Sequence, residues 1–270
     1  MSTTRPRNTS RYGWQPDLPD ARDHIHSVPR IALATLPPSV DLRDHQPAVY
    51  DQGRIGSCTA NAIAGAFEFD LVKQGLVDFT PSRLFIYYNE RAVEGQVLYD
   101  SGAQIRDGIK SVARLGVPPE SEWPYDDTPP EYDGGPFPSD ARAGQKPSAE
   151  VYADALANRA ISYQRVVRDL DQLRGVLANG FPFVFGFSVY TSFESREVAS
   201  TGVAPMPQPD EELLGGHAVL AVGYDDAGSR FLVRNSWGTG WGQEGYFTLP
   251  YEYLTERSLS SDFWTVRSVS

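Results

Sequence analysis

A single thiol determines the chemistry that this sequence offers. Cys58 is the only cysteine among 270 residues, and it follows the run Gln-Gly-Arg-Ile-Gly-Ser at positions 52–57. A lone cysteine has no partner for a disulfide within the chain, so it is either an inert packing residue or a nucleophile. His217 and Asn235 lie far downstream. A thiol, an imidazole and a carboxamide are the groups that a Cys/His/Asn hydrolase needs.

The local pattern around the cysteine predicts a helix that begins at the thiol. Ser57 is an expected N-cap, apolar residues recur at helical spacing from Cys58 to Lys73, and Gly75 suits the C-terminal cap. The N–H groups and the dipole at a helix N-terminus stabilise a thiolate. A neighbouring His217 would add an ion pair and donate a proton to the leaving amine, while Asn235 would orient the imidazole.

A glutamine upstream is a candidate oxyanion donor. Gln52 precedes Cys58 across a turn that contains two glycines. Its amide is expected to point an N–H at the developing oxyanion, with the backbone N–H of Cys58 as the second donor. Taken singly, each residue has an ordinary explanation, as a buried cysteine, a core histidine, a turn asparagine or a loop glutamine. Their occurrence together and in this order favours catalysis.

The elements that must position these groups change from helical to extended along the chain. Helices are also expected at 80–93, at 105–115 and at 169–179, whereas 117–150 is rich in Pro, Gly and Asp and is expected to be irregular. Strands are expected at 181–189, 216–224, 231–235 and 246–249. Helices first and antiparallel strands later predict an α+β fold with two lobes.

Bulk properties exclude several classes of partner. The net charge of −11 and the pI near 4.8 argue against nucleic acid or an anionic membrane. No window approaches about 18 consecutive apolar residues, so no membrane span is expected. Residues 1–10 lack the apolar stretch of a secretory signal, and together with the single cysteine this favours a cytoplasmic location. No metal motif occurs, no cofactor is expected, and the remaining histidines are expected to be solvated: His24, His26 and His45.

Three motifs in order resemble the papain family of cysteine peptidases. The segment from Gln52 to Cys58 looks like the family's nucleophile segment, and Gly216-His217-Ala218-Val219 resembles its histidine strand. The run from Asn235 to Tyr246 is similar to its asparagine motif at nearly every position. The resemblance covers most of the chain and implies a papain-like two-lobed α+β fold, in which the cleft lies between a helical lobe and a β-barrel-like lobe.

The resemblance also implies roles for individual residues. Cys58 is the expected nucleophile, His217 the general acid/base, Asn235 the orienting residue and Gln52 the oxyanion donor. Trp237 is expected to shield the His217–Asn235 hydrogen bond from water. The substrate-binding residues expected along the cleft are Gly102, Ala103, Gly216 and Trp237. The implied activity is that of a thiol endopeptidase, which hydrolyses a peptide or protein substrate through a thioester acyl-enzyme.

Departures from the family pattern shape the expected organisation. Thr59 follows the cysteine where the family often carries an aromatic residue, and Ile55 and Asp100 stand where two disulfide cysteines are expected. The family's long helical propeptide is replaced by the short segment 1–38, which is expected to cover part of the cleft and restrain activity, as in a zymogen. The chain is therefore divided into an extension at 1–38, a mainly helical lobe at 39–150 and a mainly β lobe at 151–270.

Two other functions remain open at this point. A transpeptidase or amide-forming acyltransferase would use the same thioester but another amine as acceptor. A non-catalytic peptide-binding module would keep the scaffold without the chemistry. The presence of Cys58 with its supporting residues speaks against the second alternative.

Overall fold

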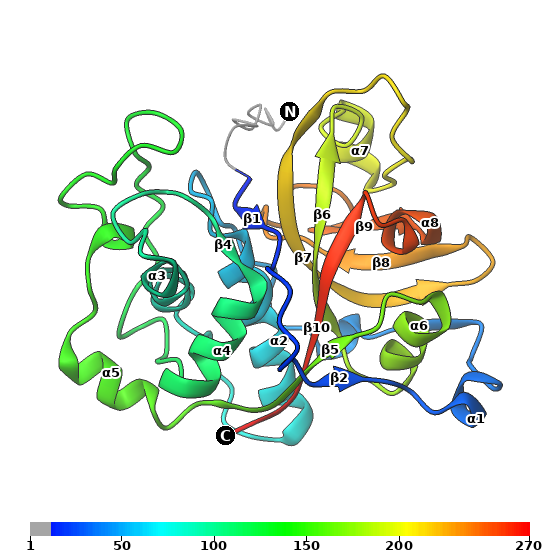
Figure 1. Cartoon of the computed structure of the whole chain (residues 1–270), viewed down its shortest axis with the longest axis horizontal. Coiled ribbons are helices and arrows are strands. Elements are labelled where there is room, and N and C mark those ends of the chain that lie inside the picture. The colour runs from blue at the N-terminus through cyan, green and yellow to red at the C-terminus, as the bar shows by residue number, and fades with distance from the viewer. Residues whose placement is uncertain (1–11) are drawn as a thin grey trace.

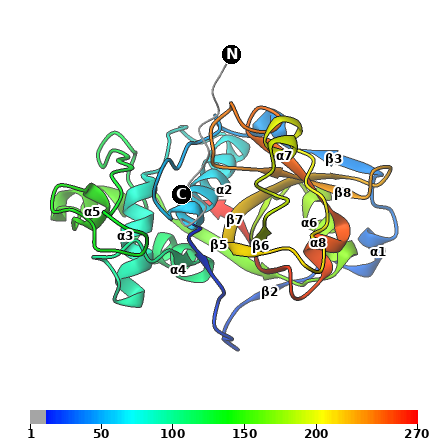
Figure 2. The same ribbon diagram turned by 90° about the horizontal axis from the view of Figure 1, so that it is seen from above.

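The computed structural model describes residues 12–270 and confirms the papain-like α+β fold. Helices α3, α4 and α5 lie on one side, the long strands and helices α6, α7 and α8 lie on the other, and α2 runs between them (Figure 1). The blue N-terminal segment passes down the junction of the two halves (Figure 1). Seen from above, the same two halves stand side by side (Figure 2).

Most of the secondary structure lies where the sequence patterns place it. The helices are α1 (Arg30–Leu33), α2 (Cys58–Gln74), α3 (Arg83–Glu94), α4 (Ile105–Leu115), α5 (Ala149–Ala155), α6 (Leu170–Ala178), α7 (Arg196–Thr201) and α8 (Tyr251–Thr255). Short 3-10 helices occur at η1 (Arg43–His45) and η2 (Arg142–Gly144). The strands are β1 (Trp14–Gln15), β2 (Ile25–His26), β3 (Ser39–Asp41), β4 (Ala103–Gln104), β5 (Ala160–Val166), β6 (Phe183–Tyr190), β7 (Leu213–Asp225), β8 (Arg230–Arg234), β9 (Tyr246–Pro250) and β10 (Ser260–Val269).

The main sheet carries the elements of the second half in the order β2-β5-β10-β6-β7-β8-β9, with β3 paired to β7. All of its pairs are antiparallel except β2 with β5. Four of these strands were not expected from the sequence: the short strands β2 and β3 and the longer strands β5 and β10. Polar side chains are scattered through both longer segments, so neither shows the strict alternation that marks a strand.

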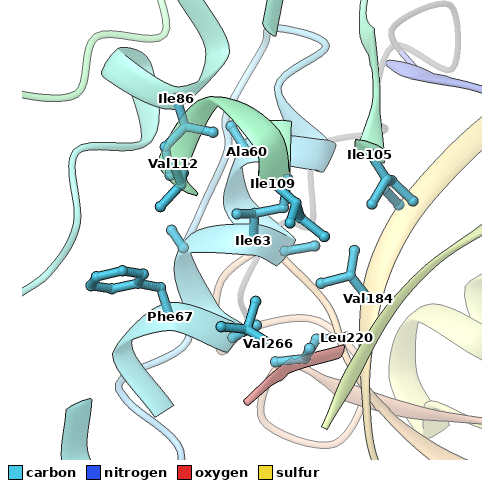
Figure 3. Packing of buried hydrophobic residues seen from close by; sticks show 14 of the residues in the cluster. Ala60, Ile63, Phe67, Ile86, Ile105, Ile109, Val112, Val184, Leu220 and Val266 are labelled. Atoms are coloured by element: carbon cyan, nitrogen blue, oxygen red, sulfur yellow. The ribbon is translucent and has the colours of Figure 1, made fainter. Parts of the chain in front are cut away.

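The central helix packs on both halves of the molecule. Every residue of α2 from Cys58 to Leu71 is buried, because β7 and β10 cover one side of the helix and α3 and α4 cover the other. Ile63 and Phe67 of the helix join Leu220 of β7 and Val266 of β10 in one apolar cluster (Figure 3). This packing fixes the start of α2, and with it Cys58, against the sheet.

Gly65 lies on the face of α2 that packs against the sheet. A Cβ added at Gly65 would lie 3.6 Å from Cδ2 of Leu220 and 3.3 Å from Nε of Arg234. An added methyl group would touch Leu220 at an ordinary contact distance and press slightly on the Arg234 side chain, so Gly65 marks a close approach of α2 to β7 and the end of β8.

Three local expectations need correction. Ser57 precedes α2 but makes no side-chain cap hydrogen bond, because its hydroxyl contacts the Tyr125 hydroxyl at 2.6 Å. The second helix, expected from residue 80, begins at Arg83, since Ser82 caps α3 by accepting the N–H of Phe85. His26 is partly buried and not solvated: its Nδ1 lies 3.0 Å from Oε1 of Gln164, and burial together with the nearby Arg267 lowers its pKa.

The N-terminal extension and the lobe boundary also differ from the expected layout. Residues 1–11 lie outside the described part of the chain, and from residue 12 onward the extension contributes β1, β2 and α1. Strand β3 at 39–41, assigned to the helical lobe, pairs with β7 and belongs to the sheet. The chain therefore enters the sheet before it forms the helical half, and residue 39 is not the point at which it changes lobe.

Leu220→Ala is expected to lower the free energy of unfolding by about 2–5 kcal/mol, because it opens a cavity between α2 and β7. Urea titration followed by tryptophan fluorescence measures the change. Val77→Ala is the control, since Val77 is 86% exposed and its truncation is expected to cost less than about 0.5 kcal/mol. Equal midpoints for the two variants would contradict the proposed core.

Candidate active site

The thiol lies where the first turn of α2 meets the sheet. Cys58 is the first residue of α2 and is fully buried. Its Sγ accepts a hydrogen bond from the backbone N–H of Ala218 at 3.4 Å, and backbone N–H groups of Thr59 and Gly13 also face it. Because Ala218 directly follows His217, the helix start and the histidine strand meet at the sulfur.

The imidazole is held by the segment that follows β8. Nε2 of His217 lies 2.9 Å from Oδ1 of Asn235, and both residues are buried. Asn235 is itself fixed, because its Oδ1 also accepts the N–H of Ser236 at 2.8 Å and its own N–H donates to the carbonyl of Gly245. The indole of Trp237 stacks on the imidazole with the ring centres 4.9 Å apart.

The glutamine is tied to the same segment. The backbone N–H of Gln52 donates to the carbonyl of Ser236 at 2.8 Å, and its Oε1 accepts the Ser236 hydroxyl at 2.7 Å. Its Nε2 donates to the carbonyl of Ile55 at 3.1 Å. A carboxamide nitrogen carries two hydrogens, so one N–H orients the side chain and the second remains to donate to an oxyanion.

Burial makes the thiol of Cys58 harder to ionise. Burial raises the pKa of Cys58 to about 11, although the N–H groups of Ala218, Gly13 and Thr59 act in the opposite direction. The site therefore holds the expected groups around a thiol that is hard to ionise, and the extension contributes to this burial because the N–H of Gly13 faces Sγ.

The extension runs through the junction directly over these groups. Strand β1 pairs in parallel with β4, and the carbonyl of Gly13 accepts the N–H of Ala103 at 2.7 Å. A Cβ added at Gly13 would lie 1.6 Å from the carbonyl oxygen of Gly56, so only glycine fits there. The Tyr12 ring lies 5.8 Å from the His217 ring, and its hydroxyl donates to Glu194.

The expected substrate-binding residues line the path of this segment. A Cβ at Gly102, where φ is +70°, would lie 2.2 Å from the carbonyl oxygen of Gly13. A Cβ at Gly216 would lie 2.6 Å from the Trp14 indole. Gly102, Ala103 and Gly216 thus let a polypeptide backbone and a large ring come close, as a cleft for an extended peptide requires.

A hydrogen-bonded carboxylate takes the place of the missing disulfide. Oδ1 of Asp100 accepts the N–H of Gly56 at 3.0 Å and the hydroxyl of Tyr87 at 2.6 Å. The Tyr87 hydroxyl in turn accepts the N–H of Gly102 at 3.1 Å. The turn before Cys58 is therefore linked to the Gly102–Ala103 segment. The only sign of this link in the sequence was that Asp100 stands where the family pattern has a disulfide cysteine.

The residue after the nucleophile candidate packs in a polar setting. The hydroxyl of Thr59 donates to Oε2 of Glu90 at 2.8 Å, and both side chains are fully buried. Burial raises the pKa of Glu90 well above its usual range. This buried pair occupies the place where the family often carries an aromatic residue, and the sequence alone did not suggest the contact with Glu90.

Other features of the described residues limit what the site holds. Within residues 12–270, no three His, Cys, Asp or Glu side chains gather in a way that would hold a metal ion. In the same range, no helix has the length and apolar character to cross a bilayer.

Comparisons with known proteins point to one family. The model of the family described as "Papain family cysteine protease" matches residues 36–258. The solved structure of xylellain, a cysteine protease from Xylella fastidiosa, has a TM-score of 0.92 and 49% identity, and each chain is fully covered.

Two relatives with known sequences extend this result. An uncharacterised peptidase C1-like protein of Acanthamoeba polyphaga mimivirus is 44% identical over 229 residues, which is 82% of this chain and 70% of that protein. A cathepsin L of Sarcophaga peregrina is 29% identical over 234 residues, which is 81% of this chain and 60% of that protein.

A procathepsin B of Trypanosoma congolense shares the fold, with a TM-score of 0.72, 18% identity and coverage of 97% and 87% of the two chains. The extent of the family match and the similarity to xylellain confirm the resemblance that the three sequence motifs suggested. The chain belongs to the papain family of cysteine proteases.

Proposed function

We propose that Cys58 is the nucleophile of this cysteine peptidase and that His217, Asn235 and Gln52 complete its machinery. The observation that carries the proposal is the position of the Cys58 Sγ, which accepts the N–H of Ala218. The neighbouring His217 is held by Asn235, with 2.9 Å between Nε2 and Oδ1. Thiol, imidazole and carboxamide come from three distant stretches of chain, and a purely structural role gives no reason for them to meet.

Acylation follows from this geometry. The thiol proton passes to His217, and the sulfur attacks the peptide carbonyl to form a C–S bond. The resulting oxyanion accepts one N–H from Gln52 Nε2 and one from the backbone of Cys58. His217 then protonates the amine as the C–N bond breaks, and Asn235 keeps the ring in place during both transfers.

Water completes the cycle. With His217 as base, water attacks the thioester, and the peptide acid leaves while the thiol is restored. The comparisons favour this protease reaction over transfer to another amine and over a non-catalytic module.

Cys58→Ala is expected to abolish cleavage of a peptide library and labelling by an electrophilic epoxide, because no other thiol exists in the chain. Mass spectrometry detects both the products and the adduct. Val77→Ala, far from the site and exposed, is expected to match wild type. Cleavage by Cys58→Ala at the wild-type rate would refute the assignment of Cys58 as the nucleophile.

Gln52→Ala is expected to lower kcat by about 100–1,000-fold, because one oxyanion donor is lost. The rate of epoxide labelling at Cys58 should change much less, since opening of an epoxide ring develops no such carbonyl oxyanion. Steady-state kinetics and mass spectrometry measure the two effects on one preparation. A parallel loss of turnover and labelling would mean that Gln52 only supports the fold of the turn before Cys58.

The N-terminal extension acts as a built-in occluder of the cleft in this proposal. Three contacts support it: the Gly13 N–H at Sγ, the Tyr12 ring against His217, and the pairing of β1 with β4. The Gly13 N–H lies at the sulfur, so in this proposal the segment blocks access of a substrate to Cys58. A similar solved structure is itself a proform, the procathepsin B of Trypanosoma congolense.

Gly13→Val is expected to release the extension, because its Cβ would lie 1.6 Å from the Gly56 carbonyl oxygen. Turnover and epoxide labelling at pH 7 should rise, by about tenfold for each 1.4 kcal/mol of docking free energy lost. The pKa of Cys58 should fall from its raised value as water reaches the sulfur, so the alkaline limb of the labelling profile moves to lower pH.

Gly240→Val is the matched control for this variant, because an added Cβ there has no atom within 4 Å. It is expected to label at the wild-type rate. If Gly13→Val labels no faster than Gly240→Val, the extension does not restrain the site.

A further inference from the structure

A carboxyl group lies buried beside the first turn of the helix that carries the thiol. Glu90 of α3 and Thr59 of α2 are both fully buried, and the Thr59 hydroxyl donates to Oε2 of Glu90 at 2.8 Å. Thr59 directly follows Cys58, and its backbone N–H faces Sγ. One residue therefore joins the carboxyl group to the sulfur, with its side chain on the first and its backbone on the second.

The neighbouring helix leaves room for this carboxyl group. A Cβ added at Gly108 of α4 would lie 2.1 Å from Oε1 of Glu90 and 2.4 Å from Cδ1 of Ile63. Ile63 of α2 and Ile109 of α4 belong to one apolar cluster (Figure 3). The carboxyl head of Glu90 thus ends against a glycine beside apolar packing, where a methyl group would exclude it.

Glu90 has no cation paired with it in the described part of the chain. Within residues 12–270, no Lys, Arg or His nitrogen lies within 4.0 Å of its carboxyl oxygens, and its Oε1 has no hydrogen-bond partner. The adjacent Arg91 donates to four backbone carbonyls instead. Burial raises the pKa of Glu90, and the carboxylates of Glu94 on α3 and Asp107 on α4 act in the same direction.

The charge of Glu90 acts on the sulfur as well. A carboxylate at this place raises the pKa of Cys58, because two negative charges in one buried region repel each other. A carboxylic acid has no such charge, while its Oε2 still accepts the Thr59 hydroxyl. The side chain can therefore hold the first turn of α2 in either state, but it opposes the thiolate once it loses its proton.

Packing alone gives no reason for a glutamate at this position. A leucine or methionine would fill a similar volume without the cost of burying a polar group that has only one hydrogen-bond partner. The contact with Thr59, next to the thiol, supplies a reason that is connected with the reaction.

We propose that Glu90 is a positioning residue for Cys58, which acts through Thr59 and must be uncharged when the thiolate forms. It fixes the start of α2 so that the N–H of Thr59 stays directed at Sγ. Its ionisation makes the thiolate harder to form. The inference rests on the proposed role of Cys58 as nucleophile and adds a group that none of the three sequence motifs contains.

The test measures the pKa of Cys58 in the full-length chain, in which a single thiol makes the result unambiguous. Glu90→Gln keeps an oxygen that accepts the Thr59 hydroxyl but cannot become negatively charged. The pKa is read from the pH dependence of iodoacetamide labelling, followed by mass spectrometry. Glu90→Gln is expected to lower this pKa, so that labelling in the alkaline range quickens by about threefold or more.

Glu252→Gln is the matched control, because it removes the same charge from an exposed position on α8, in the other half of the molecule (Figure 1). It is expected to label at the wild-type rate, since an exposed and distant charge is screened. Thermal unfolding of both variants checks that they are folded. Equal values for the pKa of Cys58 in Glu90→Gln and Glu252→Gln would overturn the inference.

A second measurement keeps Glu90 and changes its partner. In the full-length chain with Gly13→Val, Thr59→Val keeps the shape of the side chain but removes the donor, whereas Thr59→Ser keeps the hydroxyl. Thr59→Val is expected to lower kcat for a fluorogenic peptide about tenfold with little change in KM, and Thr59→Ser to retain most of the turnover. Equal kcat values for these two variants would show that the hydrogen bond to Glu90 does not position Cys58.

Failure of the proposed function would look different. The Gly13→Val chain with no second change would then show neither turnover of peptides nor epoxide labelling of Cys58. The pKa comparison needs no turnover, so it tests the link between Glu90 and the thiol separately.

Discussion

The contact between the first turn of α2 and strand β7 is the feature on which the site depends. The N–H of Ala218 reaches Sγ of Cys58 across the junction of the helical half and the sheet. The buried length of α2, with Gly65 facing Leu220 and Arg234, holds the helix at the required distance. Any shift of α2 along the sheet would separate the thiol from His217 and break the hydrogen bond from the Ala218 N–H to Sγ. Catalytic geometry in this fold is therefore a property of helix–sheet packing.

Hydrogen bonds from buried polar groups fasten the loops around this contact. Asp100 links the turn before Cys58 to the Gly102 segment through Tyr87, where a disulfide was expected from the family pattern. Gln52 is bound to Ser236, which joins the oxyanion side of the site to the segment that carries Asn235. Such links need no oxidising compartment, which is consistent with a chain that has one cysteine. The cytoplasmic location itself stays a prediction.

The extension binds to the body of the protein through hydrogen bonds and ion pairs, as a ligand would. Its Asp17 accepts the Trp264 indole N–H and the Arg106 backbone N–H, and its Asp23 pairs with the Arg106 guanidinium at 2.7 Å. Burial and the neighbouring Asp262 raise the pKa of Asp17 to about 6, so this carboxyl opposes docking once it ionises at neutral pH. The segment over the cleft is thus held by some contacts and loosened by another, as a displaceable segment requires.

The sequence by itself determined the family, the fold class and the identity of the groups that meet at the site. Cys58, His217 and Asn235 stand in motifs that can be recognised from the sequence alone. The helix from Ile105 to Leu115 was predicted to the residue, because its apolar period and terminal glycine are local signals. Tertiary structure alone decided that β5 and β10 join the sheet, that Asp100 replaces a disulfide, and that Trp14 rests on two glycines against Asp262. Each of these depends on contacts between residues far apart in the chain, and such contacts leave no periodicity in the sequence.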